Sequence, residues 1–428
     1  MRKSIIKNFT CVFQTLVLCY TLNAQPSAFS DSKLVLEPHT SHLTPHTSYL
    51  IPQTPNSFSD TTLIFEPDNG GYSMLHVPAL VHNGKSTLLA FCEGRTGSGN
   101  DWSDIDLIMR RSTDNGDHWE PMQVLIPRTP GKPTSNITPI VDKDGTIHLL
   151  YQVNYANAYY MKSVDDGKSW TKPVDITYVF ETFRNKYNWK VLAPGPGHSI
   201  QLRSGRLLVP IWLCEPDRSK PGGDHRPSCV ATIYSDDHGK SWKPGDIIVN
   251  NGDLTANSKD TIVNPSESVV VELSDGRIMI NIRNESLLNR RLISYSADGI
   301  SKWTRPFFDE QLFEPVCMAS LVRLSGQTKG PSRLLFVNPD SRNNAVSIRQ
   351  MLKINKPREN LTAKLSYDEG KTWPVQKVLY ELGAGYSDVA VDNNGMMYCL
   401  VEVRESRDNV WKYKMIVRRF NMQWLSGK

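Results

Sequence analysis

An eight-residue motif, S-x-D-x-G-x-x-W, occurs four times in the chain and constrains its fold more than any other feature. The copies are STDNGDHW (112–119), SVDDGKSW (163–170), SDDHGKSW (235–242) and SYDEGKTW (366–373), and SADGISKW (296–303) is a fifth, damaged copy. The Asp can accept backbone hydrogen bonds within a tight turn, the Gly supplies a positive φ, and the Trp can pack beneath the turn. We therefore expect each copy to be a structural turn between adjacent strands, without a direct catalytic role.

Short apolar runs separated by turn signals follow from Thr61 onward. Runs such as TLLAFCE, GRLLVPIWL and MMYCLVEV are rich in Val, Ile, Leu and Tyr, and few segments show helical spacing. This texture predicts an all-β chain, and its repeated turns indicate a propeller or another closed repeat. At four strands per blade, about 365 residues suit roughly six blades, so the expected fold is a six-bladed β-propeller over 61–428.

The first 60 residues have a different character. Arg2, Lys3 and Lys7 precede the apolar stretch CVFQTLVLCY, and TLNAQ offers a cleavage position after Ala24. This pattern predicts a signal peptide over 1–24, with an uncleaved anchor as the alternative. The apolar run is too short to span a bilayer stably. Residues 25–60, rich in Ser, Thr, Pro and His, are predicted to be a flexible linker, and we expect a secreted or periplasmic protein.

Charge and cysteine content exclude several classes. The net charge of +5 is spread thinly, which gives little support to nucleic-acid binding. Five cysteines follow the predicted signal peptide, with odd number, wide spacing and no CxxC pair: Cys92, Cys214, Cys229, Cys317 and Cys399. This set is neither a disulfide framework nor a structural zinc site, so we expect most of them to pack as small buried hydrophobes.

Further phrases, taken with the repeats, resemble the sialidase superfamily, in which the repeated turn is the Asp box or BNR repeat. They are HVPAL, EGR followed by DIDLIMRRSTD, GPGHSIQLRSGRLLVP, ESVVVELSDGR, NIRN, EPVCMASLVRL and AGYSDV. Their order is that of retaining exo-sialidases, and the resemblance covers roughly residues 61 to 425. It implies a six-bladed propeller with a central site built from strand-end loops.

The resemblance also implies roles for individual residues. Tyr386 in GAGYSDV matches the nucleophile, Glu267 in NPSESVVVEL the carboxylate that activates it, and Asp101 in GNDWSDID the general acid/base. The clamp on the substrate carboxylate is matched by arginines: Arg283 in NIRN and Arg358 in PRENLTAKLS belong to its triad, and Arg95 in CEGR is a further pocket arginine.

The chemistry of such a substrate explains these residue types. A sialic acid carries a carboxylate on its anomeric carbon, so a carboxylate nucleophile would approach against a repulsion of about 1 kcal/mol at 4 Å in water. A neutral phenol avoids this repulsion, but its ordinary pKa near 10 demands a base in contact; sialidases are the tyrosine exception among glycosidases. Asp101 would protonate the leaving oxygen and then deprotonate water. We expect partial burial to raise the pKa of Asp101 for this purpose.

His76 is the one clear departure, because it stands in LHVPAL where the first arginine of the triad is expected. Imidazole cannot make the fork of a guanidinium, and the missing charge-assisted contact would cost about 1.5–3 kcal/mol of substrate binding. Three outcomes stay open. The protein cleaves sialosides with weaker binding or a more acidic optimum, it prefers a related 2-keto-3-deoxy ulosonic acid, or it binds without turnover.

Each assignment has a structural alternative. Tyr386 would otherwise be a packed strand-end aromatic, and the arginines would be surface ion-pair partners. Glu272 competes with Glu267, and Asp104 competes with Asp101. His198 and Asn136 lie in phrases that could edge the pocket.

We therefore expect a retaining exo-glycosidase that hydrolyses terminal α-linked sialic acid, or a related 2-keto-3-deoxy ulosonic acid, from glycoconjugates. Its partners would be glycans, with no cofactor, no metal, no membrane span and a monomeric state. The alternatives are a non-catalytic carbohydrate-binding propeller, and a hydrolase or lyase of uronic-acid polysaccharide on the same scaffold.

Overall fold

The computed structural model describes residues 57–67, 70–220, 223–257, 259–324, 332–342, 357–407 and 410–427. The predicted signal peptide and most of the predicted linker lie outside these ranges. One structural unit spans Pro55–Lys428, and its first strand, β1 (Ser59–Phe65), begins two residues before the predicted boundary at residue 61. No helix in the described ranges is both long and apolar enough to cross a membrane.

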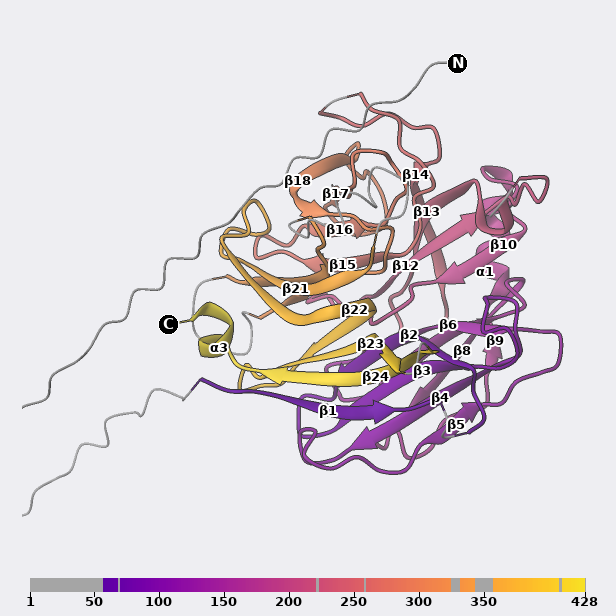
Figure 1. The fold of residues 1–428 in the computed structure, drawn as a ribbon. Helices are drawn as coiled ribbons and strands as arrows, with labels where there is room; N and C mark the ends of the chain where they lie inside the picture. Colours follow the sequence, from indigo (N-terminus) through magenta and orange to yellow (C-terminus); the bar gives the residue numbers. More distant parts are fainter. Residues whose placement is uncertain are drawn as a thin grey trace, which may run out of the picture. The chain divides into compact units, whose positions relative to one another are not determined.

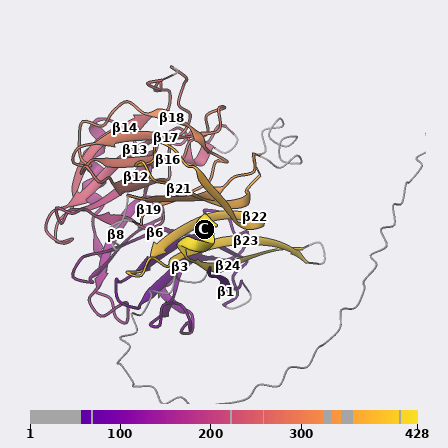
Figure 2. The ribbon, with the colours of Figure 1, turned by 90° about the vertical axis from the view of Figure 1, so that its left-hand side faces the viewer.

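Antiparallel sheets form almost all of the described chain, as predicted, and they have a propeller-like arrangement (Figures 1 and 2). Four of them are small. The first sheet contains β2 (Met74–His82), β3 (Leu88–Arg95), β4 (Ile105–Ser112) and β5 (Gln123–Ile126), and the second contains β6 (Thr134–Val141), β7 (Ile147–Val153), β8 (Asn157–Ser163) and β9 (Val174–Asp175). The third sheet contains β10 (Val191–Pro194), β11 (Ile200–Gln201), β12 (Leu207–Cys214), β13 (Ser228–Ser235) and β14 (Lys243–Asn250). The fourth contains β15 (Ser268–Glu272), β16 (Ile278–Ile282), β17 (Arg290–Ser296) and β18 (Phe307–Phe313).

The fifth sheet has seven strands, in the order β1-β24-β23-β22-β21-β20-β19. Besides β1 it contains β19 (Ser320–Arg323), β20 (Leu334–Pro339), β21 (Glu359–Ser366), β22 (Val375–Val391), β23 (Met397–Arg407) and β24 (Val410–Phe420). β22 is long enough to pair with β21 through its first half and with β23 through its second half. β1 pairs with β24, so the two ends of the unit share one sheet and cover an edge that would otherwise be unpaired.

Each copy of the repeated motif is a turn between sequential paired strands, as predicted. In every copy, the damaged one included, the Ser Oγ accepts a hydrogen bond from the Gly N–H at 2.8–3.0 Å. In the four intact copies the Asp Oδ1 accepts the N–H four residues further on at 2.8–2.9 Å. All five glycines have positive φ, so the motif is a hydrogen-bonded turn whose Gly relieves backbone strain.

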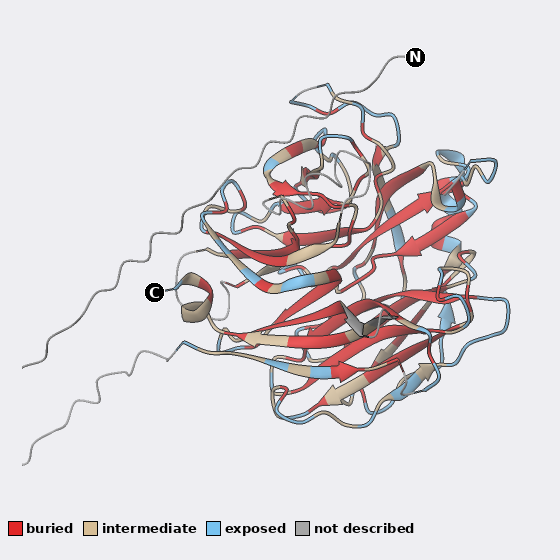
Figure 3. Ribbon diagram, viewed as in Figure 1, coloured by how far each residue is buried: buried red, intermediate tan, exposed pale blue. Residues whose placement is uncertain are grey.

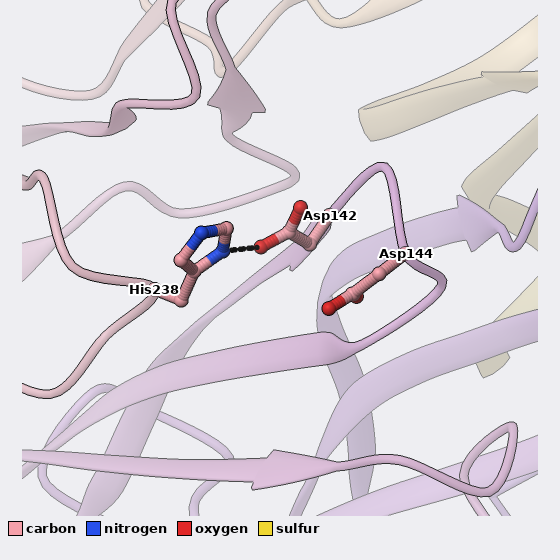
Figure 4. A group of neighbouring side chains, drawn as sticks. All are labelled: Asp142, Asp144 and His238. Carbon is pink, nitrogen blue, oxygen red and sulfur yellow. Dashed lines mark hydrogen bonds and ion pairs between the residues drawn. The ribbon is translucent and has the colours of Figure 1, made fainter.

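In three of the four intact copies the residue between Asp and Gly in the turn joins neighbouring sheets, which the sequence did not reveal. It is a non-glycine residue with positive φ in all four intact copies. The side chain of Asp166 accepts from Asn83 Nδ2 at 2.8 Å, His238 Nδ1 contacts Asp142 Oδ2 at 2.7 Å, and Glu369 accepts from the Ser274 N–H at 3.1 Å. Figure 4 shows the second junction, where Asp144 adds a third potential metal ligand.

The hydrophobic core lies between adjacent sheets, and Figure 3 shows the inner strands as buried. One cluster, for example, packs Phe91 and Leu89 of the first sheet against Leu149 and Met161 of the second. The five cysteines predicted to be buried are all buried and free, which confirms the expectation that they act as small hydrophobic side chains.

A single carboxylate near the centre, that of Asp388 on β22, connects three other segments. Its Oδ2 accepts the N–H of Leu80 at 2.9 Å and of His198 at 2.8 Å. Its Oδ1 accepts from His198 Nδ1 at 2.6 Å and from Ser320 Oγ at 3.0 Å. Burial opposes the charge on His198, but Asp388 outweighs it and raises the pKa of the imidazole. His198, which the sequence offered as a pocket edge, thus contributes to closure of the sheet arrangement.

We predict that Asp388→Ala lowers the free energy of unfolding by about 3–5 kcal/mol, because it leaves several buried donors without an acceptor. The exposed pair Asp236–Arg206 supplies the control, and Asp236→Ala should change stability by less than about 1 kcal/mol. Urea unfolding followed by tryptophan fluorescence measures both. Equal, small effects would contradict the assigned role of Asp388.

Candidate active site

The candidate active site is a cavity of about 160 Å³ where several inner strands begin. Its walls include six of the seven residues that the sequence singled out, namely His76, Arg95, Asp101, Glu267, Arg283 and Tyr386. The seventh, Arg358, is adjacent, with its guanidinium carbon 5.1 Å from the centre of the Tyr386 ring. Asn136 also lines the cavity.

The phenol of Tyr386 lies between a carboxylate and a guanidinium group. It donates a hydrogen bond to Glu267 Oε1 at 2.6 Å and accepts one from Arg283 Nη1 at 2.5 Å. Arg283 also forms an ion pair with the other oxygen of Glu267. Burial raises the pKa of Tyr386, Arg283 opposes the rise, and Glu267 adds to it. The phenol is therefore protonated at neutral pH, and Glu267 is in place to accept its proton.

A β-bulge in β22 positions Tyr386. The pairing with β23 shifts register between Ala384 and Ser387, which turns the Tyr386 N–H away from the strand ladder and toward Glu402 Oε1, 2.8 Å away. A Cβ on Gly385 would lie 1.8 Å from the same oxygen. Glycine is therefore required at position 385, because a buried carboxylate occupies the space of its side chain.

The floor under Tyr386 contains strained backbone. Val77 and Val316 have φ of +54° and +60°, a region that β-branched residues rarely adopt. Val77 packs with Cys317, Met318 and Tyr386 in one buried cluster. The carbonyl of Val316 accepts a hydrogen bond from Arg358 Nη2 at 2.6 Å. The strain is thus located at residues that hold the tyrosine ring and the Arg358 guanidinium.

His76 is held by Glu402 through its Nδ1 atom. Its ring centre lies 4.6 Å from that of Tyr386. Burial opposes the ionised form of Glu402, but His76 and Arg358 outweigh it and lower the pKa of that carboxyl. One ionised carboxylate, that of Glu402, therefore contacts both His76, which stands in place of the expected triad arginine, and the backbone N–H of Tyr386.

Asp101 belongs to a second group of charged residues in the cavity wall, in which it pairs with Arg95. Arg95 Nη1 donates to Asp101 Oδ1 at 2.7 Å, and Arg95 also donates to buried Glu93 at 2.6 and 2.8 Å. Burial favours the neutral carboxyl, but the charge of Arg95, with His225 and His76, lowers the pKa of Asp101 to about 2. The expectation of a raised pKa for Asp101 was therefore wrong, because a fixed guanidinium outweighs desolvation.

Sequence reasoning missed Glu93, Glu402 and His225. The two glutamates carried a signal, because each interrupts an otherwise apolar strand, and a buried charge requires a partner. His225, in the 3₁₀ turn η2 (Gly223–His225), carried none. Only the fold brings its ring beside Trp102, Tyr155 and Trp212, at centroid distances of 5.8, 4.9 and 5.4 Å.

A larger cavity, of about 750 Å³, lies toward the other ends of the inner strands. Its walls are mainly aliphatic and include Leu80, Val271 and Val389, with Arg203 and Glu272 among the polar residues. The phenol of Tyr386 donates to Glu267, whereas Glu272, the alternative to Glu267, accepts a hydrogen bond from Arg203 Nε at 2.8 Å. Size therefore does not locate the site; the convergence of acids, arginines and a phenol does.

Comparison with known proteins shows which family the chain belongs to. The BNR repeat-like domain family matches residues 86–399. A sialidase of Micromonospora viridifaciens is 27% identical over 390 residues, which cover 83% of this chain and 53% of the relative. An exo-alpha-sialidase of Arthroderma benhamiae is 26% identical over 395 residues, which cover 83% of this chain and 85% of the relative. This chain thus spans about half the length of the bacterial relative.

A solved structure adds the fold. The sialidase of Trypanosoma rangeli, in complex with 2,3-difluoro-KDN, superposes with a TM-score of 0.63 at 20% identity, over 86% of this chain and 58% of that one. The chain belongs to the BNR repeat-like domain family, and it is similar to a sialidase and to an exo-alpha-sialidase.

We predict that Gly385→Ala displaces Glu402 or Tyr386 and lowers kcat/KM on a fluorogenic sialoside by about 10²-fold, since small misplacements at a reacting centre have effects of this size. Gly383→Ala, on the same strand, is the matched control. Its Cβ would come no closer than 3.3 Å to Arg404, so activity should stay within about threefold. Equal activity of the two variants would contradict the assigned contact with Glu402.

Proposed function

We propose that this protein is a retaining exo-glycosidase that hydrolyses a terminal α-linked sialic acid, or a related 2-keto-3-deoxy ulosonic acid, from glycoconjugates. The observation that carries the proposal is the 2.6 Å hydrogen bond from the Tyr386 phenol to Glu267. A packed structural tyrosine has no need of a buried carboxylate and a guanidinium on the same oxygen. The names of the sialidase relatives support the same reaction.

In the first step, the Tyr386 oxygen attacks the anomeric carbon while Glu267 accepts the phenol proton. The bond to the leaving oxygen breaks, and a proton that passes through Asp101 neutralises that oxygen. Arg283, which donates to the phenol oxygen, stabilises the negative charge that develops on it. The product is an aryl glycoside, in which the anomeric carbon is bonded to the Tyr386 oxygen, and its anomeric configuration is inverted.

In the second step, water attacks the same carbon and Asp101 accepts the water proton. The bond to the Tyr386 oxygen breaks, and Glu267 returns the proton to the phenol. Two inversions give net retention. The lowered pKa of Asp101 keeps its carboxyl in the ionised form that this step requires.

Binding of the substrate carboxylate is assigned to Arg283, Arg358 and His76. The two guanidinium groups lie near the Tyr386 ring, at 5.9 and 5.1 Å from its centre, and planar guanidinium groups suit a carboxylate. His76 supplies an imidazole in place of a third guanidinium. It leaves more room and a different donor geometry, which is the reason to include other ulosonic acids as substrates.

The remaining assignments complete the proposal. We assign six blades of four strands, because β22 serves both as the last strand of one group and as the first strand of the next. The propeller begins with β1 at Ser59, two residues before the boundary at 61, and a linker and a cleaved signal peptide precede it. Glycans are the partners, and the protein acts as a secreted or periplasmic monomer.

We predict that Tyr386→Phe lowers kcat on 4-methylumbelliferyl sialoside by on the order of 10³-fold or more, because it removes the nucleophilic oxygen and keeps the ring. Tyr367→Phe, at an exposed position, should have no effect. Wild-type protein incubated with 2,3-difluorosialic acid should gain the mass of one glycosyl group on the peptide that contains Tyr386. Full turnover by Tyr386→Phe, or a label elsewhere, would disprove the mechanism.

We predict that His76→Arg lowers KM for sialosides by about tenfold or more, because a guanidinium restores a paired, charge-assisted contact with the carboxylate. The KM for a 2-keto-3-deoxy ulosonide measured in parallel should fall as well, because its carboxylate is also on the anomeric carbon. His118→Arg, at an exposed histidine, is the control. A higher KM for both sugars would indicate that His76 makes a contact that arginine cannot replace.

A further inference from the structure

The proposed acid step leaves one question, which is where the proton of Asp101 resides. Asp101 Oδ1 faces an N–H donor, Arg95 Nη1, at 2.7 Å. Arg95 is almost fully buried and is fixed by Glu93 and by the Gly99 carbonyl, 3.2 Å away. Its charge cannot move away or titrate near neutral pH. A proton on Asp101 must therefore occupy Oδ2.

The other oxygen, Oδ2, faces His225. The distance from Oδ2 to His225 Nδ1 is 3.6 Å. The imidazole is enclosed by the rings of Trp102, Tyr155 and Trp212. Its second nitrogen, Nε2, is buried without a hydrogen-bond partner among the described residues. When the ring is doubly protonated, its N–H at Nε2 therefore has no hydrogen-bond partner among the described residues, and its N–H at Nδ1 faces Asp101 Oδ2.

We propose that His225 stores the proton that Asp101 transfers to the leaving oxygen. The inference rests on the proposed function and adds a residue to its acid step. In glycosylation, the His225 imidazolium gives its Nδ1 proton to Asp101 Oδ2, and Oδ2 gives a proton to the leaving oxygen as the glycosidic bond breaks. In deglycosylation, water gives a proton to Oδ2, and Nδ1 of the neutral imidazole takes it back. His225 acts through Asp101, so it is a positioning residue for the proton.

The surrounding charges fit this arrangement. Charged and titratable groups from several elements act on the pair: Arg95, His76 and Tyr155 face Asp101, whereas Glu267, Asp224 and Arg226 act on His225. Burial lowers the pKa of His225, with Asp101 and Glu267 opposing. In the presence of Arg95 and His225 the pKa of Asp101 is lowered to about 2, so the pair takes up its extra proton first on the imidazole. A weakly held imidazolium next to Oδ2 is a proton source that Asp101 alone lacks.

Dependence on the leaving group tests the proposal with His225→Gln. Acid assistance matters for a sialyl galactoside, whose leaving alcohol is a weak acid, and little for a 4-nitrophenyl sialoside. We expect kcat/KM to fall by about 10²-fold on the galactoside and less than threefold on the aryl substrate. The alkaline limb of the galactoside pH profile should move at least one pH unit lower, since Asp101 alone loses its proton at lower pH. His118→Gln should match wild type.

Equal losses on both substrates would assign His225 a packing role and overturn the proposal, as would no loss on either. A second measurement does not require activity. In ¹⁵N NMR of the wild-type protein and of Asp101→Asn, removal of the carboxylate charge should lower the pKa of His225. An unchanged titration would overturn proton sharing even in a folded, inactive protein. Absence of release by the wild type on both substrates would instead disprove the proposed function.

Discussion

The carboxylate of Asp388 is the contact on which both the closure of the sheets and the position of Tyr386, the proposed nucleophile, depend. It is almost fully buried and accepts hydrogen bonds from Leu80, His198 and Ser320, which belong to three other segments. It lies two residues after Tyr386 on β22, so the two side chains share a face of the strand. The same strand bulges at Gly385 and joins the two halves of the seven-stranded sheet. Closure of the arrangement therefore also fixes the phenol over the cavity.

The cavity is built from alternating acids and bases rather than from isolated charges. Glu267 pairs with Arg283, and Glu402 pairs with His76. Each buried ion is thereby compensated, since an unpaired one would be destabilising by several kcal/mol. Glu402 explains how the chain tolerates an imidazole in place of an arginine, because the carboxylate keeps a hydrogen-bond partner at His76 Nδ1 and still anchors the Tyr386 backbone.

Much of the fold could be predicted because its determinants are local. The motif around Asp165 and Gly167 specifies a turn within eight residues, and the alternation of short apolar runs specifies strands. The proximity of Tyr386 to Glu267 followed only from the family resemblance, since 119 positions separate them. The pKa of Asp101 was predicted in the wrong direction, because burial was foreseen and the locked guanidinium of Arg95 was not. His225 gave no sequence signal at all.

By itself, the sequence determined the strand texture, the repeated turns, the buried cysteines and the family, because each depends on residue type and short-range spacing. Only the tertiary structure decided which charges face each other. It placed Glu402 between His76 and the Tyr386 backbone, and it placed His225 against Asp101. These pairings arise where β-bulges and loops of different sheets converge on one cavity. Electrostatic interaction depends on distance in space, which residue order does not contain.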